Sequence, residues 1–262
     1  MQACKELTVE NSPRGFERDY RLYDATAGTY DQERFGGRAG AWGHWRQVSV
    51  LRGMLPDWEG IRVLELGCGT GRITEFLARL GARITATDIS VPMLEMAKSR
   101  MLGLSGIAVP EFRPMSIYDI DVGTEGYDVI LAINVIGRLS DPSGALSGIS
   151  RAMSEKCRFL FNFPCLTSVL APFGILVNMR RKSLGRNVTS RWHTPNSILR
   201  FCRDADLAVT RWYGNHYVPL PRRLFLTLPL FRACDFLLSE RFPRLCPSVF
   251  AECRRVLAKS PF

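Results

Sequence analysis

Residues 63–72 read Val-Leu-Glu-Leu-Gly-Cys-Gly-Thr-Gly-Arg, an apolar run with one acid that leads into three glycines at alternate positions. A short aliphatic run of this kind is typical of a buried parallel strand. Glycines directly after it allow a tight turn and a close approach of the backbone to a ligand. We therefore expect an α/β protein whose first core strand ends in a loop that holds an adenosine-like group.

The order of the glycines separates this loop from a related one. Dinucleotide-binding enzymes carry G-x-G-x-x-G, whereas Gly67, Gly69 and Gly71 form G-x-G-x-G after Glu65. The segment resembles the first motif of class I S-adenosylmethionine-dependent methyltransferases, in particular those of small-molecule and quinone biosynthesis. The resemblance implies that the turn, with Cys68, passes under the methionine and ribose moieties of S-adenosylmethionine, and that S-adenosylhomocysteine is the product.

Further apolar segments follow in the order that a doubly wound α/β fold requires. We expect strands at 63–66, 83–88, 109–115, 127–134, 157–163, 208–213 and 250–257. Helical spacing of apolar residues separates most of them. The resemblance implies a Rossmann-like, seven-stranded, mostly parallel sheet whose last strand is antiparallel, with an N-terminal helical lid and a helical cap inserted after strand five.

The chain length limits the domain organisation. A chain of 262 residues, 46% of them hydrophobic, suffices for one α/β domain with a cap and is too short for two catalytic domains. We expect a lid over residues 1–57 and a methyltransferase domain over 58–262, with substrate-cap insertions at about 165–193 and 217–247. The chain shows neither a run of roughly 18 apolar residues nor a signal peptide, which predicts a cytoplasmic protein.

The second expected strand ends in an acid, Asp88. In a parallel sheet such an acid faces the ligand crevice, where it can accept hydrogen bonds from both ribose hydroxyls. The alternative role, an N-cap of the next helix, suits Ser90 better, because Pro92 follows it in the first helical turn. We therefore predict that Asp88 binds the ribose.

The adenine ring has four candidate contacts. In the family, residues just after the ribose-binding acid line the ring, which implies Ile89 and Met93, although Met93 suits a core position equally well. At the end of strand three the family often carries an acid that binds the adenine amino group. That position is Ser116 here, so its hydroxyl or the backbone amide of Ile117 would read the ring edge.

The expected strand at 127–134 resembles the fourth strand of the family. Its carboxyl end, Ile133, Asn134 and Val135, is expected beside the reacting methyl group. Many small-molecule methyltransferases carry a histidine a few residues later, and this chain has Arg138 there. One ready candidate for a general base is therefore missing.

The N-terminal region supplies two further candidates. Residues 23–31 resemble the helix that precedes the core in methyltransferases of quinones, sugars and natural products, where a tyrosine closes over the cofactor. This implies that Tyr30 contacts it. Arg46, on the amphipathic stretch 42–55, suits the methionine carboxylate because a guanidinium binds a carboxylate with two hydrogen bonds; the alternative is an ordinary surface arginine.

Methyl transfer is an in-line attack on the methyl carbon of a sulfonium, and it requires alignment and exclusion of water but no metal. A hydroxyl nucleophile would benefit from a general base. Histidine has a pKa near neutral, and the chain has only His44, His193 and His216. We expect His193, before the helix that follows the basic cap, to be the base, with His216 as the second candidate; a structural role is as good an interpretation for each.

The net charge of +10 is concentrated near the cap, since residues 171–203 contain seven Arg or Lys and no acid. A solvated basic face explains this, and so does an acidic, carrier-linked or lipid-linked substrate or a membrane surface. The apolar segment 224–238, broken by Pro229, suits a core helix pair, a lipid-facing lid or a dimer surface. Monomer and homodimer both stay open.

We expect a methyltransferase of a small or medium-sized metabolite, acting on oxygen rather than nitrogen or carbon. The alternatives are an RNA methyltransferase, which basic surfaces permit, and a non-catalytic, membrane-associated cofactor-binding protein. Against the first, the end of strand four lacks the Asp or Asn, two prolines and aromatic of amino-directed DNA methyltransferases, and the resemblance of Asn162-Phe-Pro-Cys to that motif is coincidental. The intact glycine loop argues against the second.

Overall fold

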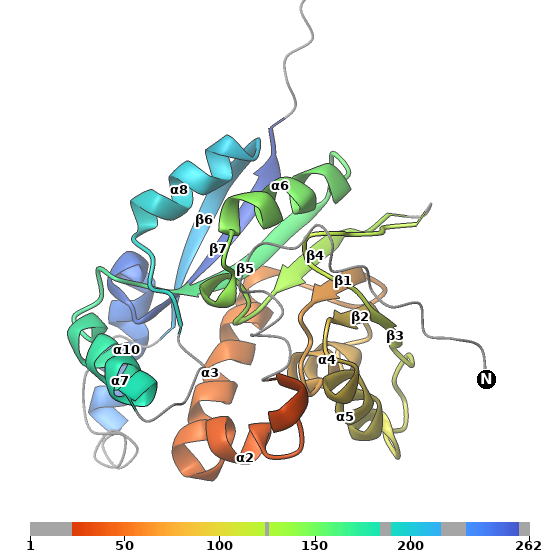
Figure 1. Ribbon diagram of the computed structural model, residues 1–262, viewed down its shortest axis with the longest axis horizontal. Coiled ribbons are helices and arrows are strands. Elements are labelled where there is room, and N and C mark those ends of the chain that lie inside the picture. The colour runs from red at the N-terminus through yellow and green to blue at the C-terminus, as the bar shows by residue number, and fades with distance from the viewer. Residues whose placement is uncertain (1–22, 124–125, 184–189, 216–228, 257–262) are drawn as a thin grey trace, which may run out of the picture.

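Seven strands form one sheet in the order β3-β2-β1-β4-β5-β7-β6 (Figure 1). The protein is represented by a computed structural model that describes residues 23–123, 126–183, 190–215 and 229–256. The strands are β1 (Arg62–Leu66), β2 (Arg83–Asp88), β3 (Glu111–Pro114), β4 (Val129–Ala132), β5 (Arg158–Pro164), β6 (Leu207–Asn215) and β7 (Ser248–Arg255).

The first five strands are parallel, and β7 is antiparallel to both β5 and β6. The predicted seven-stranded sheet with an antiparallel last strand is thus confirmed. The chain starts in the centre, runs outward through β2 and β3, and returns to place β4 on the other side of β1. This reversal opens a crevice between the carboxyl ends of β1 and β4, where ligands bind in such sheets.

Helices cover both faces of the sheet (Figure 1). They are α2 (Tyr30–Phe35), α3 (Gly37–Met54), α4 (Arg72–Ala78), α5 (Val91–Met101), α6 (Pro142–Ala152), α7 (Ala171–Ser183), α8 (Pro195–Asp204) and α10 (Pro229–Arg241), with 3₁₀ turns η2 (Ile136–Arg138) and η3 (Pro243–Leu245). Three starts have side-chain caps: Ser90 accepts from the Met93 N–H, and Asp141 and Thr194 do the same for α6 and α8.

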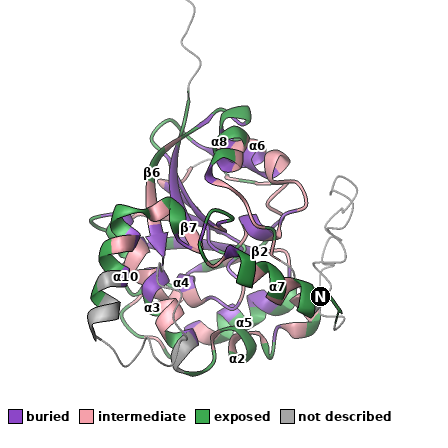
Figure 2. Cartoon of the chain, turned by 90° about the vertical axis from the view of Figure 1, so that its left-hand side faces the viewer, coloured by how far each residue is buried: buried purple, intermediate pink, exposed green. Residues whose placement is uncertain are grey.

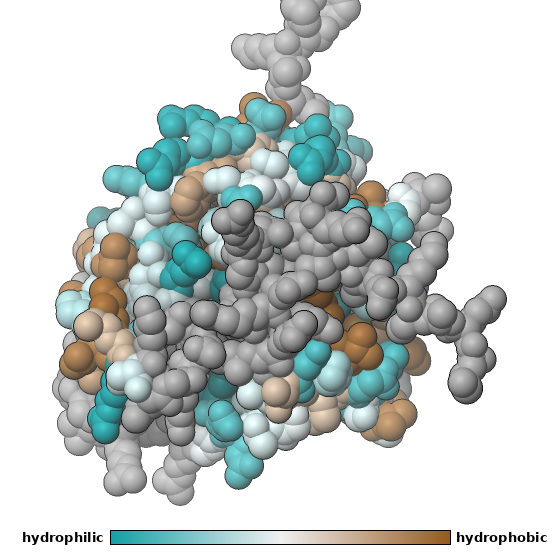
Figure 3. All heavy atoms as spheres, viewed as in Figure 1, coloured by the Kyte–Doolittle hydropathy of each residue, from teal (hydrophilic) through white to brown (hydrophobic). Residues whose placement is uncertain are grey.

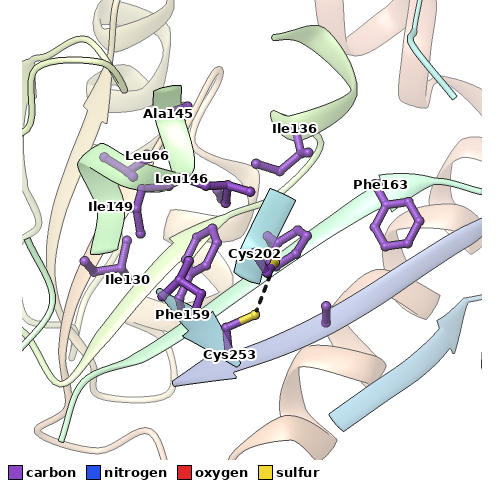
Figure 4. Packing of buried hydrophobic residues seen from close by; sticks show 14 of the residues in the cluster. Leu66, Ile130, Ile136, Ala145, Leu146, Ile149, Phe159, Phe163, Cys202 and Cys253 are labelled. Atoms are coloured by element: carbon purple, nitrogen blue, oxygen red, sulfur yellow. Dashed lines mark hydrogen bonds between the residues drawn. The ribbon is translucent and has the colours of Figure 1, made fainter. Parts of the chain in front are cut away.

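The central strands are buried on both faces, because helices cover each side (Figure 2). On one face Ile130 and Phe159 pack against Leu146 and Ile149 of α6 (Figure 4). On the other face Val63, Ile84 and Val129 pack against helices α3, α4 and α5. Neighbouring residues of a strand therefore serve opposite cores, which explains the nearly continuous apolar runs in the sequence.

Several boundaries differ from the expected ones. Strand β4 ends at Ala132, two residues before Asn134, because Asn134 has a φ of 62° and leaves the extended conformation. Strand β3 begins only at Glu111, since it is an edge strand and Val109 is 85% exposed. Helix α10 begins at Pro229, as a proline in the first turn permits. Residues 224–228 of the expected apolar segment lie outside the described residues.

Candidate functional site

A cavity lies at the carboxyl ends of β1, β2 and β4, at the crevice where the strand order reverses. Its lining comes from four places. These are the end of β1 with the glycine loop and the start of α4 (Glu65, Gly67, Cys68, Thr70, Arg72, Ile73), the segments after β2 and β3 (Asp88, Ile89, Met115, Ile117, Tyr118), the segment after β4 (Ile133, Asn134, Val135, Arg138, Leu139, Ser140), and the N-terminal helices with the residues before them (Tyr23, Tyr30, Phe35, His44, Gln47).

The three glycines of the loop have φ values of 71°, 56° and 76°, a region that favours glycine. A Cβ on Gly67 would lie 2.6 Å from a methyl carbon of Val135, and one on Gly71 would lie 2.9 Å from the Cβ of Ala97 on α5. A Cβ on Gly69 would meet nothing within 4 Å. Two glycines thus allow close packing, and the middle one leaves open space at the loop.

Two acids flank the loop, of which Glu65 is buried and Asp88 is partly buried. Asp88 accepts hydrogen bonds from the N–H groups of Gly69 (2.8 Å) and Ser90 (2.9 Å), and burial raises its pKa. Glu65 accepts a hydrogen bond from the Thr74 hydroxyl (2.6 Å), and burial raises its pKa to about 7. Since both side chains line the cavity, each offers acceptor oxygens to a ligand there.

Asn134 follows β4 in a left-handed conformation that a network of amides holds. The Asn134 N–H donates to Oδ1 of Asn162, which orients the Asn162 amide, and Nδ2 of Asn162 donates back to Oδ1 of Asn134 at 3.0 Å. Nε2 of Gln47 donates to the same oxygen at 3.1 Å. The Asn134 oxygen is therefore saturated, and its NH₂ group remains as the donor at the cavity wall.

Ionic and hydroxyl contacts fasten the N-terminal helix over the glycine loop. The Thr70 hydroxyl donates to Asp31 at 2.6 Å, and Arg100 of α5 forms an ion pair with the same carboxylate. Nε of Arg100 also donates to the Thr70 carbonyl at 2.7 Å. Ahead of α2, Asp24 accepts from the Ser90 hydroxyl at 2.5 Å. These contacts place Tyr23, Tyr30 and Phe35 in the cavity wall.

Arg46 does not line the cavity, contrary to its predicted place beside a carboxylate ligand. It is buried between α3 and α10, where it donates to the Ser239 hydroxyl at 2.9 Å and lies 3.9 Å from the Asp235 carboxylate. The positive charge of Arg46 is therefore paired with Asp235 of α10. Arg72, directly after the glycine loop, lines the cavity instead, and its Nη1 is buried without a hydrogen-bond partner among the described residues.

The three histidines occupy different places. His193 lies outside the cavity lining, its ring packs edge-on against Phe201 of α8, and burial and Arg191 lower its pKa. His44 lines the cavity, and burial, aided by Arg72 and Arg100, lowers its pKa to about 4. His216 lies outside the described residues. Only His44 of the two described histidines faces the cavity.

Two of the four residues that were predicted to contact adenine line the cavity. Ile89 and Ile117 line the cavity, whereas Met93 and Ser116 do not. Met93 is 1% exposed at the start of α5, the core position that the sequence also allowed. The Ser116 hydroxyl accepts a hydrogen bond from the Tyr118 N–H at 3.2 Å, which closes the turn after β3.

Several site residues were not predicted from the sequence, among them Gln47, Asn162 and Arg72. Gln47 lies in no motif and Asn162 only in a resemblance that is coincidental, so their role emerges only where α3 and β5 meet Asn134. Arg72 did have a signal, since it directly follows the last glycine of the loop. His44 was named as one of three histidines, but nothing in the sequence placed it at the cavity.

The central part of the chain matches a family model described as "Methyltransferase domain" over residues 64–159. The ubiquinone biosynthesis O-methyltransferase of Leptothrix cholodnii is 27% identical over 173 residues, which cover 64% of this chain and 73% of that protein. The enzyme of the same name from Rhodopseudomonas palustris is 29% identical over 175 residues, 63% of this chain and 66% of that protein.

Solved structures share the fold. Magnesium protoporphyrin IX methyltransferase from Synechocystis, crystallised with bound S-adenosylhomocysteine, superposes with a TM-score of 0.66 at 17% identity, covering 92% of this chain and 99% of that one. The mitomycin 7-O-methyltransferase structure gives a TM-score of 0.63 at 16% identity, covering 91% of this chain and 60% of that one. At such identities the likeness speaks for the fold alone.

Proposed function

The chain is a class I S-adenosylmethionine-dependent methyltransferase, and we propose that it methylates an oxygen of a small or medium-sized metabolite in a biosynthetic pathway. The observation that carries this proposal is the cavity at the switch point, bounded by the glycine loop, Asp88 and Asn134. Similarity to ubiquinone biosynthesis O-methyltransferases supports oxygen as the methylated atom.

The residues around the glycine loop fit S-adenosylmethionine. The open space at Gly69 allows the ligand to lie close to the backbone of the loop. Each carboxylate oxygen of Asp88 has a second lone pair that can accept a hydrogen bond from a ribose hydroxyl. We assign the methionine carboxylate to Arg72, whose buried Nη1 makes no hydrogen bond within the described residues. Ile89 and Ile117 would flank the adenine from the ends of β2 and β3.

The chemistry supplied by the bound cofactor is an electrophilic methyl group on a sulfonium centre. The protein aligns the acceptor and excludes water. Asn134, with its oxygen saturated by Gln47 and Asn162, directs two N–H donors at the cavity and would hold an oxygen of the acceptor. Tyr30 and Phe35 would close the cavity from the lid.

We propose His44 as the histidine that orients the acceptor hydroxyl. With a pKa of about 4 it is neutral above about pH 5 and can accept a hydrogen bond there. A base role for His193 remains a prediction that the ring's position against Phe201 does not favour. His216, the other predicted base, lies in a part of the chain that the structure does not describe.

Two variants separate these histidines. We expect His44→Ala to lower kcat by about tenfold or more, and His193→Ala to leave kcat within roughly twofold because His193 does not line the cavity. The assay is steady-state methyl transfer across the pH range. A larger loss of kcat in His193→Ala than in His44→Ala, together with loss of the pH dependence of kcat, would instead identify His193 as the base.

The acceptor is proposed to be acidic or carried on a lipid or carrier protein, since Arg138, a second arginine besides the one assigned to the cofactor, lines the cavity. The decisive experiment incubates metabolite extracts with the enzyme and methyl-labelled S-adenosylmethionine and detects products by mass spectrometry. A labelled product in the wild type that is lost in Asp88→Ala supports the proposal. Labelling of RNA alone would contradict it.

A further inference from the structure

Helix α7 exposes large apolar side chains to solvent. Phe173, Leu176 and Met179 are 67%, 62% and 64% exposed. With spacings of three residues they lie on one side of the helix. Figure 3 shows brown and tan spheres along the left-hand edge of the molecule, where Figure 1 places both α7 and α10. Val169, just before the helix, is 57% exposed and extends this set.

The opposite side of α7, which faces the protein, is small and polar. A Cβ on Gly174 would lie 2.2 Å from the indole ring of Trp192, so the helix approaches that ring through a glycine. The Asn178 side chain donates to the Ser190 carbonyl at 3.0 Å. A surface helix normally buries its apolar side and exposes its polar side. Helix α7 instead exposes its large apolar side chains and turns the small Ala171 and Gly174 toward the protein, which indicates that its outer side is covered in use.

Basic residues stand at the end of this helix. Arg180 is exposed on it, and in the sequence Arg181 and Lys182 follow directly, with no acid between residues 171 and 203. A helix with an outward apolar side and adjacent basic residues is the pattern of a segment that lies in the interface of an anionic membrane. No described helix is long and apolar enough to cross a bilayer, which fits a helix that lies on one.

We propose that α7 docks this protein on an anionic membrane surface, with Phe173, Leu176 and Met179 inserted among the lipids and Arg180 beside their headgroups. Two copies of this chain that met through α7 would bring like charges together, which disfavours a symmetric dimer at this surface. An anionic bilayer complements both the apolar side chains and the charge. The docking surface does not depend on the identity of the methyl acceptor.

Backbone contacts connect the docking surface to the cavity. Trp192 packs on α7, and the neighbouring Arg191 N–H donates to the Gly137 carbonyl at 2.7 Å. Gly137 belongs to η2, whose next residue, Arg138, lines the cavity. A membrane bound at α7 would therefore lie on the side of the molecule that carries this cavity wall. That position suits an acceptor that reaches the enzyme from the bilayer.

The test is sedimentation of the full-length protein with vesicles of phosphatidylcholine alone and of phosphatidylcholine with phosphatidylglycerol at roughly 3:1. We expect binding to the mixed vesicles that weakens with salt. Leu176→Ser should reduce binding about tenfold, and Arg180→Glu should reduce it by a similar factor of about ten. Both side chains are exposed, so the fold should tolerate the changes, which circular dichroism checks.

Matched controls lie on other surfaces. Leu102→Ser replaces a leucine that is 79% exposed at the end of α5, and Arg203→Glu reverses an exposed charge on α8; both should bind like the wild type. Equal losses in the controls, or no sedimentation of the wild type, would overturn the proposal. So would a dimer in light scattering that Leu176→Ser dissociates without any vesicle binding. A protein that binds the mixed vesicles but transfers no methyl group would contradict the proposed reaction and not the proposed docking surface.

Discussion

Three glycines at alternate positions perform three different tasks. Gly67 permits contact with Val135, Gly71 permits contact with Ala97 of α5, and Gly69 borders open space. All three have positive φ, which costs other residues about 1–2 kcal/mol. The motif therefore combines a shared backbone requirement with separate steric ones.

This division predicts different consequences of alanine substitution. Gly67→Ala should lower the free energy of unfolding by about 3 kcal/mol or more, since strain is added to the overlap with Val135. Gly69→Ala should cost only about 1–2 kcal/mol but weaken S-adenosylhomocysteine binding roughly tenfold. Urea denaturation and calorimetric titration measure the two effects. Equal destabilisation by both variants would contradict the assignment.

Glu65 is a buried acid whose pKa of about 7 lies above its ordinary value of 4.5, because burial disfavours the carboxylate. The folded protein thus binds more protons than the unfolded chain between these pH values. Stability that is present below about pH 4.5 is therefore lost as the pH rises toward 7. The Thr74 hydrogen bond offsets part of this effect.

We expect the wild type to lose about 3 kcal/mol of unfolding free energy between about pH 5 and pH 8 relative to Glu65→Gln, which has no such proton to release. Denaturation in urea at the two pH values measures this difference. Parallel pH profiles of the two proteins would show that Glu65 titrates normally.

Among the elements, α2 depends on side-chain contacts more than on its own length. It has six residues, and no residue of it is buried. Asp31 joins it to Thr70 and Arg100, which belong to the glycine loop and α5. Such a short helix should open more readily than the sheet, which suits a segment that covers a ligand.

Asp31→Ala should therefore raise the dissociation rate of S-adenosylhomocysteine about fivefold while changing the unfolding free energy by less than about 1 kcal/mol. Stopped-flow displacement measures the rate. Glu95→Ala is the control, because it removes an exposed ion pair with Lys98 on α5 that does not reach α2. An unchanged rate in Asp31→Ala would exclude α2 as the cover.

The elements themselves were largely predictable. The caps at Ser90 and Thr194 and the strand before the glycine loop follow from local turn chemistry and apolar periodicity. The end of β4 was wrong by two residues, because amide contacts from α3 and β5, and not a local breaker, turn the chain at Asn134. The order of the elements follows from local sequence patterns, whereas the position of this boundary depends on tertiary contacts.

In the whole molecule the cavity joins parts that are far apart in the chain: the N-terminal helices, the ends of β1 and β2, and the segment after β4. A ligand bound there should stabilise the folded state as a unit. At a concentration about 100 times its dissociation constant, it adds about 2.7 kcal/mol.

For a chain of this length, S-adenosylhomocysteine at about 100 times its dissociation constant should raise the Tm by roughly 5–10 °C. Differential scanning calorimetry measures the shift. Asp88→Ala at the same ligand concentration should show a smaller one, and an equal shift in both proteins would sink the assignment of Asp88 to the ribose.

The sequence by itself determined the alternation of strands and helices, the glycine loop, and Asp88 beside it, because periodicity and turn chemistry act over a few residues. Only the tertiary structure decided that Gln47 and Asn162 hold Asn134, that Arg72 lines the cavity while Arg46 pairs with α10, and that His193 packs against α8. Those contacts join distant residues, and the packing of helices on the sheet, which no local pattern encodes, selects them.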